Sequence, residues 1–411
     1  MLHPNDAESK ILSLVQPFQA QQDIETVDLL SAHGRVLAQD VVSQLDFPHW
    51  DNSAMDGYSV RFEDVKTASK EHPITLTVVE EIPAGCQPQH RIQFQQAARI
   101  FTGAIVPEGS DTIVIQEDTD RAGDQVTVFE APVPKAFVRH KAAFYQAGSS
   151  LLPQGTVLNA PEIAVLAAAQ CPQVTVYRRP VVAILSTGDE LVSIDQPLQA
   201  GQIVDSNRYA LSALIQSSGA TPTSFGIIPD TPEALKRAIA TALEESDLIV
   251  SSGGVSVGDY DYVDRILEEL GATLHVRSVA VKPGKPLTVA SFQEKLYFGL
   301  PGNPVSALVS FWRFVQPALM KLSGHPGPHS PTFVSGRSRH DLKAGGKRET
   351  YLWGQVRLVG GEYEFSLAGG SHSSGNLINL ASTNALAIVP IGQTHISANS
   401  PVSIMLVGPP R

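Results

Sequence analysis

The fold is decided by the stretch Val181-Val182-Ala183-Ile184-Leu185-Ser186-Thr187-Gly188-Asp189-Glu190, in which an apolar, largely β-branched run passes directly into a polar loop. The same change recurs where Leu248-Ile249-Val250 precedes Ser251 to Asp259, and where Val279-Ala280-Val281 precedes Lys282 to Ser306. In a parallel sheet such loops emerge together at the carboxyl ends of the strands, where ligands bind. The loops are rich in glycine, hydroxyl groups and charge, so the sequence predicts a pocket for a phosphorylated, anionic molecule.

Strand and helix patterns alternate around these loops from residue 180 to residue 323, which is typical of a doubly wound parallel sheet. We expect Pro317 to kink or divide the last helix, because proline lacks a backbone N–H. The predicted strands are 181–186, 223–228, 248–252, 275–281 and 296–299, and the predicted helices are 207–218, 232–245, 261–270 and 304–322.

The regions on either side of this α/β unit have other patterns. Residues 8–22 carry apolar residues at helical spacing and predict a helix interrupted by a proline. Residues 74–82 and 92–130 alternate as short strands and turns, which indicates an all-β insert, and Ala160 to Ala169 predicts a short helix. Residues 332–411 are rich in glycine and β-branched residues without a helical period, and they predict a small β-barrel or sandwich.

Size and composition narrow the classes of protein. A chain of 411 residues is too long for one ordinary core, so we expect two to four domains. The net charge of −11 and the lack of a basic run argue against a nucleic-acid partner. No apolar stretch has membrane-spanning length and the start lacks the features of a signal peptide, so no membrane association is expected. Cys86 and Cys171 form no metal or disulfide pattern, which favours a cytoplasmic setting.

Two short segments predict an anion site. Lys282-Pro283-Gly284-Lys285-Pro286 holds two ammonium groups on a stiff loop, which suits an oxyanion or phosphate. In Leu300-Pro301-Gly302-Asn303-Pro304-Val305-Ser306, Asn303 is a good N-cap and Pro304 a good first helical residue. Ser306 would then lie beside free backbone N–H groups at the positive end of a helix. A solvated turn and ordinary capping are the simpler alternatives for each segment alone.

Acidic residues accompany the anion site. Asp259 and Asp261 follow the glycine-rich loop, and Asp189 and Glu190 lie on its neighbour. Carboxylates beside a phosphate pocket indicate Mg²⁺, which is usually held by one or two carboxylates and the ligand's phosphate. Asp259 or Asp261 could instead cap the helix over 261–270. The polar loop from Asp51 to Tyr58 is either a turn at a domain boundary or part of a site.

Five motifs, in order along essentially the whole chain, resemble those of the MoeA family of molybdopterin molybdenumtransferases, which is related to the C-terminal domain of gephyrin. The motifs are Asp51-Asn52-Ser53-Ala54-Met55-Asp56-Gly57-Tyr58, Ser186-Thr187-Gly188-Asp189-Glu190-Leu191, Ser252-Gly253-Gly254-Val255-Ser256-Val257-Gly258, Lys282-Pro283-Gly284-Lys285-Pro286 and Leu300-Pro301-Gly302-Asn303-Pro304-Val305-Ser306.

The resemblance implies a multidomain homodimer. It would comprise a discontinuous linking domain, a β insert domain, a MogA/MoaB-like doubly wound α/β domain and a C-terminal β-barrel domain. It would insert molybdenum from molybdate into adenylylated molybdopterin, hydrolysing the adenylate with Mg²⁺. Its partners would be an upstream MogA-type adenylyltransferase and apo-molybdoenzymes or their chaperones. The implied boundaries are 20–50 with 141–178 for the linking domain, 51–140 for the insert, 1–19 with 179–326 for the α/β domain, and 327–411 for the barrel.

The resemblance also implies roles for individual residues. Asp56, Glu190, Asp230 and Asp261 would be catalytic, and Glu190 and Asp261 would also bind the metal. Molybdate would be bound by Lys282, Lys285, Ser306, Arg348 and Ser374. The pterin or its phosphate would be bound by Ser186, Thr187, Gly188, Ser252, Gly253, Gly254, Ser256, Gly258, Pro301, Gly302 and Asn303.

Three positions depart from the family's pattern. Phe144 stands where an acidic residue is usual, Ser278 where a lysine is common, and Trp353 where arginine is often found. Arg277 offers a nearby replacement for the missing lysine. Because of Phe144, the alternative to the enzyme is a divergent paralogue that binds molybdopterin or molybdenum cofactor as a carrier or scaffold. A generic nucleotide-binding α/β protein would leave the paired lysines and the Asp51–Tyr58 loop unexplained.

Overall fold

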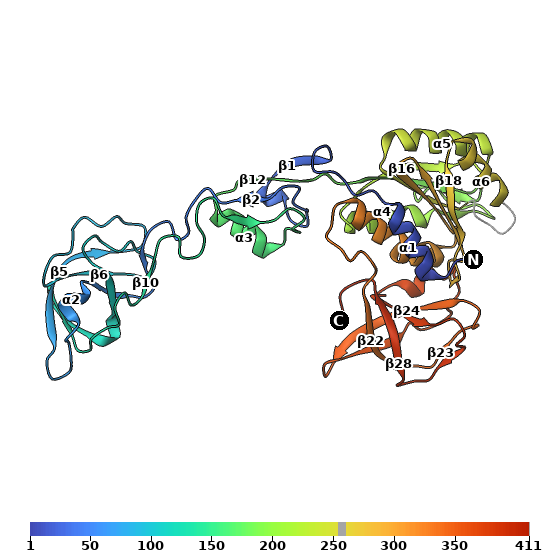
Figure 1. Ribbon diagram of the computed structural model, residues 1–411. Helices are drawn as coiled ribbons and strands as arrows, with labels where there is room; N and C mark the ends of the chain where they lie inside the picture. Colours follow the sequence, from blue (N-terminus) through green and yellow to red (C-terminus); the bar gives the residue numbers. More distant parts are fainter. Residues whose placement is uncertain (254–259, 411) are drawn as a thin grey trace. The chain divides into compact units, whose positions relative to one another are not determined.

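The computed structural model describes residues 1–253 and 260–410 (Figure 1). The chain divides into two compact units, and both are discontinuous in sequence. The first unit comprises Met1–Gln39, Gly155–Asn159 and Thr175–Arg411, and the second comprises Asp40–Gln154 and Ala160–Val174. The finer boundaries of the four domains implied by the resemblance remain a prediction.

A six-stranded sheet with the order β16–β13–β17–β21–β20–β18 forms the centre of the first unit. The prediction of a doubly wound α/β sheet is confirmed, and β16, β13, β17 and β21 are parallel. The expectation of a parallel sheet fails at one strand, because β20 runs antiparallel to both of its neighbours, β21 and β18. A two-residue connection joins β20 to β21, and a connection that short can join only antiparallel strands. The strands are β13 (Val181–Thr187), β16 (Thr221–Ile228), β17 (Leu248–Ser252), β18 (Thr273–Ser278), β20 (Pro286–Phe292) and β21 (Lys295–Leu300).

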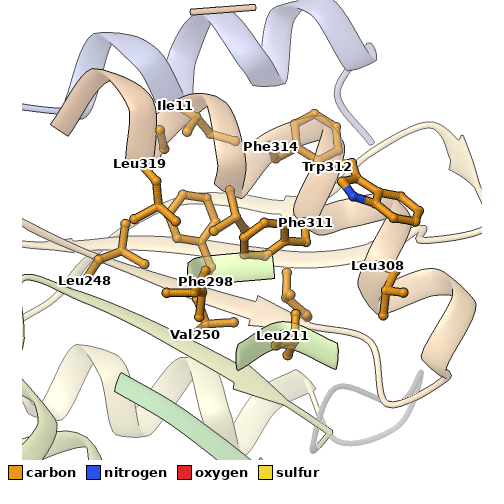
Figure 2. Close-up of a cluster of buried hydrophobic side chains, with 14 of the residues drawn as sticks. Ile11, Leu211, Leu248, Val250, Phe298, Leu308, Phe311, Trp312, Phe314 and Leu319 are labelled. Carbon is orange, nitrogen blue, oxygen red and sulfur yellow. The ribbon is translucent and has the colours of Figure 1, made fainter. Parts of the chain in front are cut away.

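Helices cover both faces of this sheet, as Figure 1 shows. One face packs against α1 (Pro4–Leu14), α4 (Ser206–Ser217) and the helix that follows β21, and the other packs against α5 (Pro232–Glu245) and α6 (Tyr260–Glu269). In the first layer, Phe298, Phe311 and Leu319 are fully buried (Figure 2). Full burial of such a side chain contributes about 1.5–3 kcal/mol, so this layer holds the loops at the sheet edge rigidly.

Pro317 divides the helix that follows β21, as the sequence predicted. The helix begins after Asn303 as α7 (Pro304–Ser310), widens to a π-helical turn at η3 (Phe311–Val315) and continues as α8 (Gln316–Leu322). Proline has no N–H for the usual intrahelical hydrogen bond, and the wider turn accommodates that loss.

The C-terminal region is a closed barrel. Its strands follow the order β24–β25–β22–β28–β26, and β26 pairs again with β24. The short strand β19 (Val281–Lys282) joins β24 in parallel, so the Val279-Ala280-Val281 run ends against the barrel and not at the parallel edge predicted for it. The strands are β22 (Phe333–Ser338), β23 (Leu342–Lys343), β24 (Glu349–Val359), β25 (Glu362–Leu367), β26 (Ala385–Val389), β27 (His395–Ile396) and β28 (Pro401–Leu406), with η4 (Leu377–Leu380) between β25 and β26.

The second unit contains the predicted all-β region. Six strands pair in the order β7–β4–β6–β5–β9–β8 around a core that includes Tyr58, Leu76 and Val114. The strands are β4 (Gly57–Val60), β5 (Ile74–Ile82), β6 (Gln96–Ile100), β7 (Thr112–Ile115), β8 (Thr119–Ala122) and β9 (Gln125–Val128). The remaining elements of the unit are β2 (Val41–Val42), β3 (Asn52–Ser53), α2 (Phe62–Val65), η2 (Gln116–Asp118), β10 (Val138–Arg139), β11 (Ser150–Leu152) and the predicted helix α3 (Ala160–Ala168).

The first helix lies further upstream than the residue pattern predicted. α1 ends at Leu14, so the prediction of a helix over 8–22 is wrong in both bounds. The helix begins early because Pro4 suits the first helical position and the His3 ring accepts a hydrogen bond from the Asn5 N–H at 3.3 Å. It ends early because Pro17 disfavours helical geometry before it. β1 (Ile24–Asp28), η1 (Leu29–Ser31) and β12 (Gln173–Tyr177) follow in this part of the fold. Among the described residues, no helix is both long and apolar enough to cross a membrane.

Candidate functional site

A cavity of about 470 Å³ lies at the carboxyl ends of β13, β17 and β21. This is the edge at which the sequence placed the polar loops. The strands end together there, so residues distant in sequence share one cavity. Of the predicted site residues, the cavity is lined by Thr187, Gly188, Glu190, Asp230, Ser252, Gly253, Pro301, Gly302, Asn303 and Ser306.

The backbone at Gly253 passes so close to the backbone at Thr187 that only glycine fits there. Gly253 has φ +99°, and a Cβ on it would lie 2.1 Å from the carbonyl oxygen of Thr187. A side chain at this position would therefore push apart two of the loops that form the cavity. A Cβ on Gly302 would in turn lie 3.5 Å from Cα of Gly253, so the third loop packs against the second.

The start of α4 supplies cavity residues that the sequence reasoning missed. Asn207 is buried, and its Nδ2 donates to Oγ of Ser252 at 2.7 Å and to the carbonyl oxygen of Gly302 at 2.8 Å. Asp205 caps the helix by accepting from the N–H of Arg208. The signal was present in the sequence, because Ile203-Val204 passes into Asp205-Ser206-Asn207 as the other apolar runs pass into polar loops. The other missed lining residues are Leu191, Ile203, Val204, Ser206, Pro286 and Pro304. Leu191 and Ile203 pair within the short strands β14 (Leu191–Val192) and β15 (Ile203–Val204).

Within residues 1–253 and 260–410, several polar atoms around this cavity are buried without a hydrogen-bond partner. They include Oγ1 of Thr187 and Oδ1 of Asn207. Both Nδ2 protons of Asn207 are engaged by oxygen acceptors, so its remaining group must be the acceptor oxygen. Unsatisfied buried polar groups are uncommon in folded proteins, and their presence here supports a site for a polar ligand.

Three predicted molybdate-binding residues carry positive charge but are not among the residues that line this cavity. Neither the ammonium of Lys282 nor that of Lys285 has a hydrogen bond or ion pair within residues 1–253 and 260–410, and the guanidinium of Arg348 bonds only the carbonyl oxygen of Val281, at 3.3 Å. The pairing of β19 with β24 places Lys282 opposite Thr350, close to Arg348. Pro286, which follows Lys285, lines the cavity. Uncompensated positive charge in a protein of net charge −11 favours an oxyanion.

Ser306 lies in the first turn of α7 against the lysine loop, and the backbone of Ser374 contacts the same turn. A Cβ on Gly284 would lie 3.5 Å from the carbonyl oxygen of Ser306, so the loop packs on the first turns of the helix. Ser374 approaches from the barrel, and its carbonyl oxygen accepts a hydrogen bond from the Val305 N–H at 3.2 Å. Asn303 holds the predicted N-cap position but makes no side-chain capping bond. The Val305 N–H, one of the groups that the sequence predicted to be free, is therefore already hydrogen-bonded to Ser374.

The acidic residues lie at the rim. Glu190 and Asp230 are exposed and line the cavity, and the Asp230 N–H donates to Oδ1 of Asp189 at 3.1 Å. Carboxylate oxygens suit Mg²⁺, which needs only one or two of them when a ligand phosphate completes its shell. Within the described part of the chain, no three His, Cys, Asp or Glu side chains form a metal cluster. The donor set therefore fits a cation shared with a bound phosphate.

Some predicted site residues are not brought to this cavity. Ser186 is buried within β13 and does not line it. Gly254, Ser256 and Gly258 lie outside the described residues. The backbone of Asp261 belongs to α6, and its side chain is outside the described part.

Asp56 and Phe144 belong to the second unit. The carboxylate of Asp56 accepts hydrogen bonds from the N–H of Thr102 at 2.7 Å and from its hydroxyl at 2.8 Å. The Thr102 N–H, followed by the hydroxyl, lowers the pKa of the Asp56 carboxyl, which holds it ionised. The Phe144 side chain is 65% exposed, and its ring centroid lies 5.8 Å from that of Phe47.

The two other departures lie in the first unit. Trp353 is buried and packs on His372 with 4.6 Å between ring centroids, so it joins the apolar cluster between the barrel and the α/β part, where an arginine would carry charge. Ser278 ends β18. Arg277 pairs with Asp264 at 2.8 Å and with Glu268 at 3.4 Å. These pairs engage Arg277, which argues against the replacement role considered for it.

Comparison with known protein families matches nearly the whole chain. Residues 2–169 match the MoeA N-terminal region (domain I and II), residues 183–321 match a probable molybdopterin binding domain, and residues 335–407 match the MoeA C-terminal region (domain IV). The three matches follow one another in the order in which the structure shows the β region, the α/β sheet and the barrel.

Individual relatives agree with these matches. The molybdopterin molybdenumtransferase of Nostoc sp. is 58% identical, over 98% of this chain and 95% of its own length. That of Haemophilus influenzae is 34% identical, over 98% of both chains. Among solved structures, the molybdopterin biosynthesis moeA protein from Pyrococcus horikoshii aligns with a TM-score of 0.83 at 28% identity, covering 99% of this chain and 100% of its own.

Proposed function

This chain belongs to the MoeA family, and from that premise we propose that it is a molybdopterin molybdenumtransferase. It inserts molybdenum from molybdate into adenylylated molybdopterin and hydrolyses the adenylate, which yields molybdenum cofactor. The observation that carries the proposal is the polar cavity at the sheet edge, which Pro286 lines next to Lys285. Within the described residues, Lys282 and Lys285 have no ion pair and Arg348 bonds only a backbone carbonyl oxygen.

The cations account for binding of molybdate. The substrate is a dianion, and two ammonium groups with one guanidinium can offset its charge while donating hydrogen bonds to its oxygens. Ser306 and Ser374 supply hydroxyl groups on the side where α7 begins. We assign the two ligand groups to different loops. Ser252, Gly253 and Gly302 bind the pterin phosphate, and the loop from Lys282 to Pro286 binds the oxyanion.

Mg²⁺ is the cation that fits the carboxylates of this site. Glu190 and the predicted ligand Asp261 would hold it, with Asp230 close by at the rim. When bound, Mg²⁺ neutralises phosphate charge and stabilises the charge that develops as the phosphoanhydride is hydrolysed. The carboxylates themselves orient water and accept its proton, a role that Asp56 would share.

A homodimer is the assembly that we infer, with Asp56 of one copy completing the site of the other. A MogA-type adenylyltransferase would supply the adenylylated pterin, because this substrate is an activated phosphoanhydride. Apo-molybdoenzymes or their chaperones would accept the product.

The test of the proposal uses purified protein with adenylylated molybdopterin, molybdate and Mg²⁺. We expect AMP release that depends on molybdate and on Mg²⁺, with reconstitution of an apo-molybdoenzyme by the product. Tight binding of the pterin without AMP release would identify a carrier or scaffold instead, and Phe144 would then be the first residue to change.

A further inference from the structure

The cationic residues of the predicted oxyanion site come from two parts of the first unit, the α/β part and the barrel. Lys282 and Lys285 lie on the loop that leaves the α/β sheet, whereas Arg348 directly precedes barrel strand β24. An oxyanion bound by both requires a fixed spacing between these parts. The parallel pairing of β19 with β24 is only two residues long, so this pairing alone offers few hydrogen bonds to set that spacing.

A chain of buried side chains spans the same junction. Arg313, in the π-helical turn η3, is 1% exposed, and its Nε donates to the hydroxyl of Tyr351 at 3.0 Å. The Tyr351 hydroxyl donates to Oε1 of Glu349 at 2.5 Å. Glu349 is the residue next to Arg348, and its backbone N–H donates to the carbonyl oxygen of Ala280 at 2.9 Å. These bonds therefore connect the helix that begins at Pro304 to strand β24, which directly follows Arg348.

The direction of these hydrogen bonds is fixed by chemistry. A guanidinium can only donate and a carboxylate can only accept, so the hydroxyl between them accepts from Arg313 and donates to Glu349. Burial raises the pKa of the Tyr351 phenol above its usual range, which keeps that proton in place. The tyrosine is fully buried, so its ring cannot leave this position without disturbing the apolar cluster that it shares with Phe311 and Phe314.

The N-terminal segment holds the other side of Arg313. One Nη donates to the carboxylate of Glu8 and the other to Oδ1 of Asn5 at 2.8 Å. Just before, the N–H of Leu2 donates to the carbonyl oxygen of Ser278 at 3.0 Å, and the N–H of Ala280 donates to Leu2 at 2.9 Å. The three nitrogen atoms of the Arg313 guanidinium therefore donate to the barrel residue Tyr351 and to the two N-terminal residues Glu8 and Asn5.

Stability alone does not account for such a network. Replacing a buried ion pair by apolar residues of similar volume is often neutral or stabilising, whereas the best-attested use of buried charge is to fix one register among several. The register at this junction sets how far Lys282 lies from Arg348.

We propose that Arg313 and Tyr351 are positioning residues that set the spacing of the oxyanion site. This inference rests on the proposed function, and it concerns molybdate binding and not the pterin. The nearest chemical precedent is the outer shell of metal sites, where loss of a supporting hydrogen bond typically costs 10–100-fold in affinity.

The test compares Tyr351→Phe with the wild type in the molybdate-dependent AMP-release assay. We expect the KM for molybdate to rise about tenfold, with kcat at saturating molybdate and the KM for adenylylated molybdopterin unchanged. Arg313→Lys should act in the same direction, because one ammonium cannot reproduce three directed bonds. Its matched control is Arg178→Lys, since Arg178 also clamps two carboxylates, Asp23 at 3.0 Å and Asp247 at 2.7 Å, before β13 begins. The control should lower Tm without changing the KM for molybdate.

Arg348→Ala separates failure of this inference from failure of the site. If Arg348→Ala leaves the KM for molybdate unchanged, the proposed oxyanion site is wrong. If Arg348→Ala raises it but Tyr351→Phe does not, only the positioning role is refuted. The double variant decides whether Tyr351 acts through Arg348. We expect no further rise beyond that of Arg348→Ala, because the effects of residues coupled through one hydrogen-bond network are not additive. Additive effects would overturn the proposal.

Discussion

Replacing Gly253 by alanine would disturb the contact between two of the loops that form the cavity. The new Cβ would lie 2.1 Å from the backbone oxygen of Thr187, and no flexible side chain can yield there. Carbon and carbonyl oxygen need about 3.3 Å, so the loops must separate by roughly 1 Å. The φ of +99° adds strain of about 1–3 kcal/mol for an L residue.

The expected result is a large loss of catalysis with a moderate loss of stability. A displacement of about 1 Å at a reacting centre costs on the order of 100-fold in rate, so we expect kcat/KM for adenylylated molybdopterin to fall by about that factor. Initial rates of AMP release would measure this, with thermal unfolding in parallel.

The matched control for this substitution is Gly271→Ala. Gly271 has a similar φ of +91°, but a Cβ on it would meet nothing within 4 Å. This variant should therefore lose stability through strain alone and keep its kcat/KM. If Gly253→Ala is about as active as Gly271→Ala, the backbone contact between Gly253 and Thr187 plays no part in catalysis and the prediction is wrong.

Three further predictions concern the charged residues. Lys285→Ala should raise the KM for molybdate in steady-state kinetics at little cost in Tm, since charges on surface loops seldom carry stability; an unchanged KM would remove Lys285 from the oxyanion site. Phe144→Asp should increase Mg²⁺-dependent AMP release if a missing carboxylate limits turnover, and an equal rate in a folded variant would mean that the chain already compensates. Thr102→Val removes the hydroxyl that donates to the carboxylate of Asp56. The pKa of Asp56 is lowered in the folded protein, so the hydrogen bonds to its carboxylate stabilise the fold at pH values above that pKa, and this stabilisation is lost as the pH falls through it. We expect the Asp56 titration, followed by carboxyl NMR, to move to higher pH, and an unmoved titration would assign the shift to the backbone N–H alone.

Local patterns predicted the parts of the site that local physics determines. Apolar runs that pass into polar loops predicted the edge at which Thr187, Ser252 and Ser306 line one cavity, because parallel strands end together. The division of the last helix followed from Pro317 alone.

Features that depend on pairing between distant segments could not be predicted in this way. The antiparallel strand β20 begins inside what reads as a loop, and its partner is chosen by the sheet as a whole. The seam between β19 and β24 joins Lys282 to Thr350, and no local pattern encodes such a pairing. The run Ile203-Val204 could have predicted a further polar loop at Asp205-Ser206-Asn207, but the two bonds of Asn207, to Ser252 and Gly302, exist only once three loops have met.

The parallel pairing of Leu2 with Val279 has a consequence during protein synthesis. Translation at roughly 5–20 residues per second leaves the early segment without this partner for tens of seconds. The whole of the second unit, Asp40–Gln154 and Ala160–Val174, is made in that interval and can fold first. The apolar face of α1, with Ala7 and Ile11, is then exposed to the nascent chain's surroundings until the sheet is complete. Chaperone binding to the ribosome-bound chain should therefore persist until Val279 has left the exit tunnel and end soon afterwards.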